Sequence, residues 1–137
     1  MPFAAHRVAV NAPVDRLWAL MVEKIRTPQR FVPGVEAVEI VRDLGPLSIE
    51  RRMQVGGTLV HELITGDPAT LSVMFKLIGD QRHRGFVLNI VYPGDVPELE
   101  YVMHWHPRPG AAPDPTDWQA NVVGAVEQAK ALAEAAG

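Results

Sequence analysis

His104 and His106 are separated by one residue, and in a strand this spacing turns both imidazoles to the same face of the sheet. Zinc sites use such pairs, but they need at least a third protein ligand. The chain contains no cysteine, so a thiolate ligand is excluded. Whether the two histidines could bind a metal therefore depends on the residues that lie beside them.

The strand that ends in the two histidines must pair with the strand before it, across the turn GDVP. Apolar residues align when Tyr92 opposes Leu99, Ile90 opposes Tyr101, Leu88 opposes Met103 and Phe86 opposes Trp105. The two histidines then face outward, opposite Val87 and Gly85, which cannot bind a metal. His6 could supply a third imidazole, but Val8 and Val10 share its face and indicate that it points inward. We therefore expect two solvated histidines, no metal site and no cofactor.

Arg51 and Glu62 form a second candidate pair. Gly56 and Gly57 separate two alternating runs, and a type I′ hairpin turn needs positive φ at both central residues. In the resulting register Arg51 opposes Glu62 on a face that otherwise carries apolar residues. The next hairpin, with GDPA at 66–69 as its loop, continues this face by pairing Ile64 with Leu71, Glu62 with Val73 and Val60 with Phe75.

An ion pair on an apolar face must be removed from water, which costs several kcal/mol per ion before mutual attraction repays it. Two interpretations of the pair remain open. In the first, Arg51 offers its planar fork of donors to a carboxylate, phenolate or carbonyl of a ligand, and Glu62 orients it. In the second, the pair is an internal structural contact, or a register slip places both residues on the surface.

Hydrophobic periodicity predicts the elements that position these residues. An apolar stripe predicts a helix from Val14 to Ile25, and Asp114 and Pro115 are expected to be the N-cap and first residue of a final helix. Strands are expected at 6–11, 35–44, 47–55, 58–65, 70–78, 85–93 and 98–106, with a short helical piece or turn at 27–34. Six consecutive strands indicate an antiparallel meander in an α+β fold.

Length and composition exclude several classes of protein. The 137 residues suit one domain spanning 1–137, and a net charge of −3 gives nucleic acid or an anionic membrane no general reason to bind. The absence of cysteine fits a reducing compartment, and the first ten residues have neither the basic region nor the apolar run of a signal peptide. We expect a cytoplasmic protein without a membrane span.

The order of a strand, a helix pair, a six-stranded meander and one long final helix resembles the START or polyketide-cyclase-like (SRPBCC) superfamily, which includes the birch-pollen allergen type. NAPVDRLWALM at 11–21 and IERRMQVGGTLVHELITGDP at 49–68 carry the local resemblance. MHWHPRPG at 103–110 and the short length are similar to the AtaL-like branch, whose members are largely uncharacterised. The resemblance implies a helix-grip fold, in which a curved antiparallel sheet of about seven strands wraps around the last helix and encloses a cavity.

On this chain the resemblance places the cavity between the meander and the final helix. Its wall would consist of Arg51, Met53, Val60, Glu62, Val73, Phe75, Phe86, Leu88, Tyr101, Met103 and Trp105. Its lid would consist of Trp18 or its neighbours and of Trp118, Val122, Ala125, Ala129 and Leu132. The expected ligand-binding residues are Arg51, Glu62, Met53, Phe75, Phe86, Tyr101, Met103 and Trp105, and none is assigned as catalytic. The loop 79–85, with Arg82, His83 and Arg84, is expected to be solvated, although it could flank the mouth or meet an anionic partner.

Three functions are considered for a domain of this fold. The leading expectation is a binding protein for a small hydrophobic or amphipathic molecule with one polar or anionic group. The first alternative is a metal-free cyclase or dehydratase with Glu62, Tyr101 or an inward His6 as acid or base. The second is a protein-partner module like the chaperone activators, which would have a filled interior and an exposed apolar patch. No nucleophile elbow or phosphate-binding loop is present, and a homodimer is left open.

Overall fold

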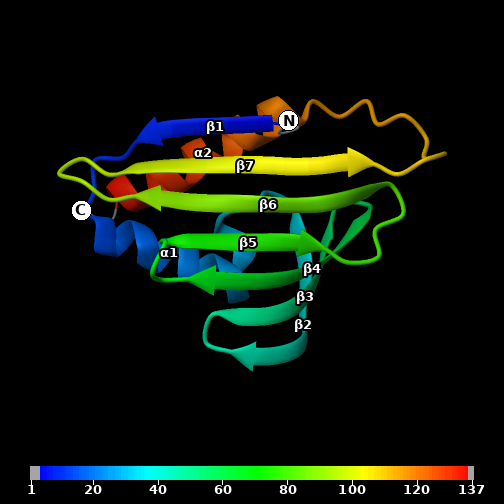
Figure 1. The fold of residues 1–137 in the computed structure, drawn as a ribbon, viewed down its shortest axis with the longest axis horizontal. Coiled ribbons are helices and arrows are strands. Elements are labelled where there is room, and N and C mark those ends of the chain that lie inside the picture. The colour runs from blue at the N-terminus through cyan, green and yellow to red at the C-terminus, as the bar shows by residue number, and fades with distance from the viewer. Residues whose placement is uncertain (1–3, 136–137) are drawn as a thin grey trace.

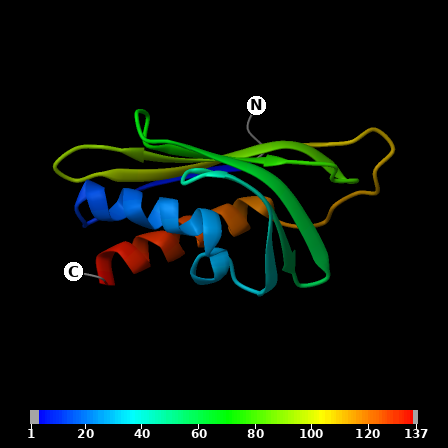
Figure 2. The same ribbon diagram turned by 90° about the horizontal axis from the view of Figure 1, so that it is seen from below.

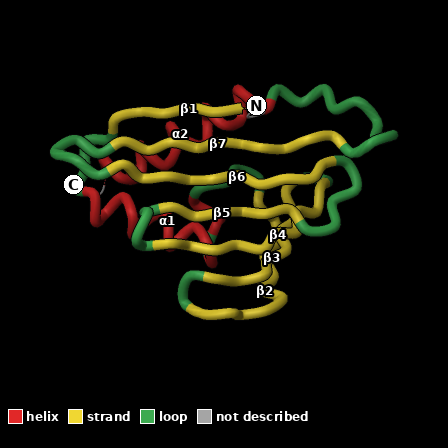
Figure 3. Tube along the Cα trace, viewed as in Figure 1, coloured by secondary structure: helices red, strands yellow, loops and turns green. Residues whose placement is uncertain are grey.

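The computed structural model describes residues 4–135. An antiparallel sheet of seven strands, in the order β1-β7-β6-β5-β4-β3-β2, lies on two α-helices (Figures 1 and 3). The strands are β1 Ala4–Ala9, β2 Val35–Gly45, β3 Ser48–Val55, β4 Thr58–Asp67, β5 Ser72–Leu77, β6 His83–Tyr92 and β7 Glu98–Pro107. The helices are α1 Val14–Arg26 and α2 Trp118–Ala135, and a 3-10 turn spans Pro28–Arg30. The predicted order of elements is confirmed.

The sheet arches over the two helices, as Figure 2 shows. Register shifts in β2 at Val35/Ala37, Ile40/Arg42 and Asp43/Gly45 mark irregular pairing with β3. Such bulges increase the local twist of a strand pair and bend it. This curvature keeps β3 and β4 away from α2 and leaves a hollow between the sheet and the helix.

Helix α1 presents its apolar stripe to the sheet, as its periodicity predicts. The buried residues of this helix are Leu17, Leu20, Met21, Lys24 and Ile25. Trp18 is only half-buried and packs against the edge of the core. One buried position of the stripe is therefore a lysine, which the sequence analysis did not single out.

Helix α2 begins later than predicted, and Asp114 is not its N-cap. The helix starts at Trp118, and Asp117 caps it by accepting a hydrogen bond from the backbone N–H of Ala120 at 3.0 Å. The carboxylate of Asp114 instead accepts from the backbone N–H of Thr116 and from the indole N–H of Trp118. The side chain of Asp114 was expected to cap a helix, but it closes the turn before the helix.

The first hairpin has the predicted register. Arg51 lies opposite Glu62, and the flanking pairs also match. Only Gly56 of the glycine pair has positive φ, at 58°, so the turn is not the expected type I′. The two-residue loop sets the register in either case, because its length fixes which residues face each other.

The predicted register of the second hairpin is wrong by four residues. Glu62 lies opposite Leu77 and Ile64 opposite Phe75, because β4 continues to Asp67 before the chain turns. The carboxylate of Asp67 accepts a hydrogen bond from the N–H of Ala69 and stabilises this later turn. An even shift keeps each side chain on its predicted face, so Phe75 still points inward.

The predicted register of the third hairpin is wrong by one residue, which reverses the faces of β6. Gly85, Val87, Asn89 and Val91 face inward opposite Trp105, Met103, Tyr101 and Leu99. Phe86 and Leu88 therefore leave the predicted cavity wall, and the ring of Phe86 stacks on His104 at 5.0 Å on the outer face. Apolar residues occupy both faces of this strand, so alternation could not decide between the two registers.

Candidate functional site

A cavity of about 620 Å³ lies between the curved sheet, the end of α1 and the first half of α2. Its volume falls within the range of roughly 300–1,000 Å³ that is usual for ligand pockets. Seven of the eight predicted site residues line it: Arg51, Met53, Glu62, Phe75, Tyr101, Met103 and Trp105. Phe86 does not, because the register of β6 turns it outward. Trp118, Val122 and Ala125 of α2 close the cavity as expected, whereas the other expected lid residues, Trp18, Ala129 and Leu132, do not line it.

Arg51 is fully buried and holds the end of α1 against the sheet. Its Nη1 donates hydrogen bonds to the carbonyl oxygens of Lys24 and Ile25, both at 2.9 Å, and its Nη2 donates to Oε1 of Glu62 at 2.9 Å. Carbonyls of the last helical turn have no partner within the helix, so the guanidinium supplies one. Most of the donor fork is thus occupied by the protein itself.

Lys24 is the charged residue of the cavity that the sequence analysis missed. It comes from the buried stripe of α1, only 8% of its surface is exposed, and it lines the cavity. Its Nζ donates to Oδ1 of Asn89 at 2.8 Å and lies 4.2 Å from the ring centre of Tyr101. Lys24 follows Met21 by three residues, so it lies on the apolar stripe of the helix. This spacing could have identified Lys24 from the sequence as a buried lysine.

The surroundings of Lys24 favour the neutral amine. Burial lowers the pKa of its ammonium to about 7, and the positive charge of Arg51 acts in the same direction. The carboxylate of Glu62 opposes this shift but does not cancel it. A lysine that can exchange a proton near neutral pH therefore faces the cavity.

Tyr101 lies beside Lys24 and is buried among apolar groups. Burial raises the pKa of its phenol, and its hydroxyl has a contact of 3.8 Å with Sδ of Met21. A phenol with a raised pKa remains protonated at neutral pH. Tyr101 can offer a ligand a hydrogen bond, but it is a poor general base.

A second polar cluster surrounds His83. Contrary to the expected solvated loop, this imidazole is buried and lines the cavity. Its ring centre lies 5.4 Å from that of Trp105 and 6.3 Å from that of Trp118. Its Nε2 lies 3.4 Å from Oδ2 of Asp114. Hydrogen bonds from Thr116 and Trp118 and the nearby His83 lower the pKa of Asp114 to about 2.

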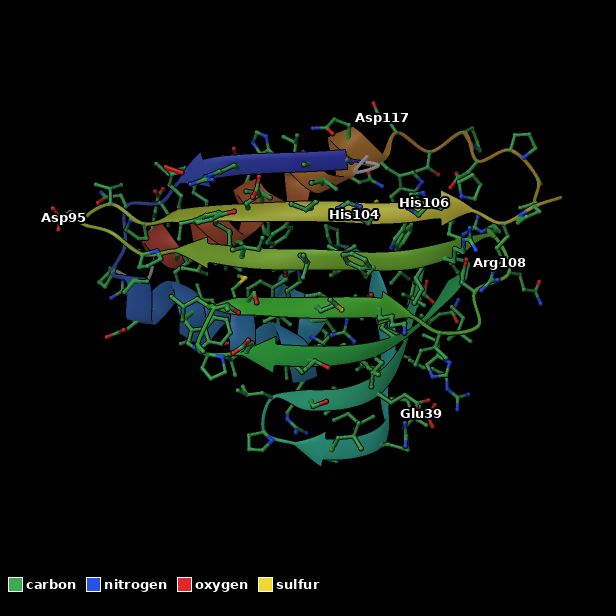
Figure 4. The ribbon with its side chains drawn as sticks, in the orientation of Figure 1. Glu39, Asp95, His104, His106, Arg108 and Asp117 are labelled. Atoms are coloured by element: carbon green, nitrogen blue, oxygen red, sulfur yellow. The ribbon has the colours of Figure 1, made fainter. Side chains whose placement is uncertain are left out.

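The remaining histidines lie outside the cavity. His104 and His106 belong to β7 (Figure 4), and they lie opposite Phe86 and Arg84 on the outer face. His6 faces α2, where its Nε2 is 3.5 Å from Oε1 of Glu127, but it does not line the cavity. Across residues 4–135, no group of three or more histidines and carboxylates is placed to hold a metal ion. No helix within the same range is both long and apolar enough to cross a membrane.

The chain belongs to the AtaL family. The family model described as "Acetylaranotin biosynthesis cluster protein L" matches residues 9–134, which is nearly the whole chain. The arrangement of its sheet and helices is the helix-grip fold that the sequence resemblance implied. A search of curated proteins finds no match.

Solved structures of low sequence identity share this fold. TTHA0849 from Thermus thermophilus superposes with a TM-score of 0.71 at 17% identity, over 98% of both chains. The di-domain aromatase/cyclase StfQ of the steffimycin biosynthetic pathway has a TM-score of 0.77 at 16% identity, over 96% of this chain and 50% of its own. The ZhuI aromatase/cyclase from Streptomyces sp. R1128 has a TM-score of 0.62 at 20% identity, over 95% of this chain and 86% of its own.

Replacing Arg51 by methionine should lower the free energy of unfolding by about 3–5 kcal/mol, because Glu62 then remains buried without its partner. The double variant Arg51→Met, Glu62→Leu should recover most of this loss. Arg42→Met is the matched control, because its pair with Glu50 lies on the outer face and Arg42 is 61% exposed, so its loss should cost less than about 1 kcal/mol. Urea unfolding measures all three. An equal cost for Arg51→Met and Arg42→Met would contradict the structural role of Arg51.

Replacing Lys24 by methionine should stabilise the protein most at low pH. The folded-state pKa of about 7 lies below the ordinary value of about 10.4, so the unfolded chain binds one more proton between these pH values. The stability of the wild type therefore rises with pH across this window, by roughly 4–5 kcal/mol in total, and Lys24→Met removes that dependence.

Loss of the hydrogen bond to Asn89 offsets about 1–3 kcal/mol of the gain, so we expect Lys24→Met to be about 1–3 kcal/mol more stable than the wild type at pH 6. This advantage should shrink as pH rises from 7 to 10. Lys76→Met, at an exposed position of β5, is the control and should change stability by less than about 0.5 kcal/mol. A pH-independent difference between Lys24→Met and the wild type would disprove the assignment.

Proposed function

We propose that this protein binds a small, mostly apolar molecule that carries an anionic or strongly polar group. The observation that carries the proposal is the cluster of Lys24, Arg51 and Glu62 on the wall of an otherwise largely apolar cavity. Two basic side chains and one carboxylate give this part of the cavity a net positive charge whenever Lys24 is protonated. An anionic group or a hydrogen-bond acceptor on the ligand would complement that charge.

The apolar part of the wall supports a ligand with a hydrocarbon or aromatic body. Met53 and Met103 contribute flexible thioether side chains, and Phe75 and Trp105 contribute ring faces. The side chain of Ala125 on α2 is small, which leaves space beside the helix. Affinity would come from burial of the ligand body, and orientation from the charged cluster.

The hydrogen bonds of the two basic residues favour Lys24 over Arg51 as the polar contact for the ligand. Arg51 already donates to two carbonyls of α1 and to Glu62, so it can act mainly by positioning these groups. Lys24 has one hydrogen bond, to Asn89, and its ammonium has further donors to offer a ligand.

A second candidate function is acid/base catalysis of the cyclase or dehydratase kind. The observation in its favour is that Lys24, whose pKa is about 7, lines the same cavity as Glu62. Of the three groups first considered, His6 lies outside the cavity and Tyr101 has a raised pKa, so Glu62 remains and Lys24 joins it. The cavity itself disfavours the third candidate, the protein-partner module, because that function predicts a filled interior.

The proposal predicts that 2-naphthoate raises the melting temperature of the wild type, whereas its neutral analogue 2-methylnaphthalene has a weaker effect. At a concentration 100 times the dissociation constant, binding contributes about 2.7 kcal/mol, which corresponds to several degrees. Lys24→Met should weaken binding of the acid at least tenfold and change binding of the hydrocarbon little. Isothermal titration calorimetry and thermal denaturation measure both effects.

Two further variants locate the binding in the cavity. Ala125→Phe, which fills space beside α2, should abolish binding of both compounds. Leu59→Ser, at an exposed position of β4, should leave both unchanged. Equal binding of 2-naphthoate by the wild type and Ala125→Phe would contradict the proposal.

A further inference from the structure

We propose that Lys24 is a covalent binding site for an aldehyde or ketone, which it holds as an imine inside the cavity. This inference rests on the proposed function, because the same cavity must admit the carbonyl compound. It goes beyond a charge contact, since the amine nitrogen would bond to the carbonyl carbon of the ligand.

The first observation is the position of the amine. Nζ of Lys24 is held by Oδ1 of Asn89 at 2.8 Å, above the ring of Tyr101 and 5.0 Å from the ring centre of Phe75. No carboxylate of residues 4–135 comes within ion-pair distance of it. The amine of Lys24 is thus held in place and shielded from bulk water, and it faces the cavity where a ligand would bind. Within the described part of the chain it has no direct ion pair that would neutralise its charge.

The second observation is that the other two lysines lack this setting. Lys76 is exposed on β5 and lies opposite Phe86 on the outer face. Lys130 donates to the carboxylate of Glu134 at 2.7 Å and to the carbonyl of Ala9 at 3.0 Å. Neither lines the cavity, so the three lysines of the chain provide one candidate site and two internal references.

The third observation concerns the protonation state that the reaction requires. Only the neutral amine attacks a carbonyl carbon. With a pKa of about 7, roughly half of Lys24 is neutral at pH 7, whereas an ordinary lysine is neutral in roughly one molecule out of 2,500. Desolvated lysines beside another cation are a recognised type of activated nucleophile, and Arg51 supplies that second cation here.

The reaction is balanced with the groups present. The lone pair of Nζ forms a C–N bond as the carbonyl π electrons move to oxygen. The nitrogen then loses a proton and that oxygen gains one, carried by water or by the carboxylate of Glu62, which lines the same cavity. A second proton, from solvent, then reaches the hydroxyl group of the carbinolamine, which leaves as water while the nitrogen lone pair forms the C=N bond. The resulting iminium ion returns one proton to solvent and becomes the neutral imine. One amine and one carbonyl give one imine and one water, without oxidation or reduction. Burial also favours the neutral imine over its protonated form, which limits repulsion from Arg51.

The test uses 2-naphthaldehyde with sodium cyanoborohydride, which reduces an imine to a stable amine. The full chain is treated at pH 7, and peptide mass mapping then separates Lys24 from Lys76, Lys130 and the terminal amine. We expect Lys24 to be modified at least ten times faster than Lys76 or Lys130. The rate at Lys24 should rise above pH 6 as the neutral amine accumulates, pass through a maximum near its pKa of about 7, and fall at higher pH, because loss of water and reduction by cyanoborohydride both need a proton.

Three variants complete the design. Lys24→Met should remove the dominant adduct, and Lys76→Met should leave it unchanged. Ala125→Phe should slow modification of Lys24 at least tenfold, because it fills the cavity without touching the amine chemistry. Circular dichroism of each variant confirms that it is folded.

The outcomes distinguish this inference from the proposed function. If 2-naphthoate binds the wild type but Lys24 reacts no faster than Lys76, the imine proposal is wrong and the binding proposal survives. If neither compound engages the cavity, both proposals are wrong. Fast modification of Lys24 that persists unchanged in Ala125→Phe would also overturn the inference, because the cavity would then play no part.

Discussion

The buried guanidinium of Arg51 is the interaction on which the rest of the site depends. It is 1% exposed and binds three acceptors, two on the last turn of α1 and one on Glu62 of β4. A buried charge needs hydrogen-bond partners, and these three acceptors fix the helix end and the carboxylate together, while Nε of Arg51 has no hydrogen-bond partner among residues 4–135. The position of Lys24 follows directly, because its own carbonyl is one of the three acceptors.

A fixed cation also determines the chemistry of its neighbour. Lys24 must share a small desolvated volume with Arg51, and Glu62 provides only one negative charge for the two. The lysine therefore gives up its proton near neutral pH, at a cost to stability that a methionine would avoid. Destabilised, preorganised groups of this kind are typical of binding and catalytic sites, where function outweighs stability. Both the binding proposal and the imine proposal derive from this single electrostatic conflict.

The sequence predicted the fold from the order of its helices and strands. It also predicted the Arg51–Glu62 pair, because a two-residue Gly-Gly loop leaves little freedom in the register of β3 and β4. It failed for Phe86, because β6 is apolar on both faces and Asn89, a polar residue on its inward face, is a buried side chain that accepts a hydrogen bond from Lys24. It failed for Lys24 because a lysine near the end of a helix is usually solvated. It placed His83 in solvent because its tryptophan neighbours come from β7 and α2, which are distant in the chain. Local sequence patterns were enough to predict the strands, whereas the burial of these polar side chains depends on tertiary contacts.

The central claim is that the cavity contains a lysine whose charge is set by burial beside Arg51. The most direct measurement is a pH titration by NMR of the protein labelled with ¹³C at the Cε atoms of its lysines, with Lys24 assigned by the Lys24→Met spectrum. The account predicts a titration of Lys24 near pH 7 that moves to higher pH when 2-naphthoate is added. A titration near the ordinary lysine value of about 10.4, unchanged by the acid, would contradict it.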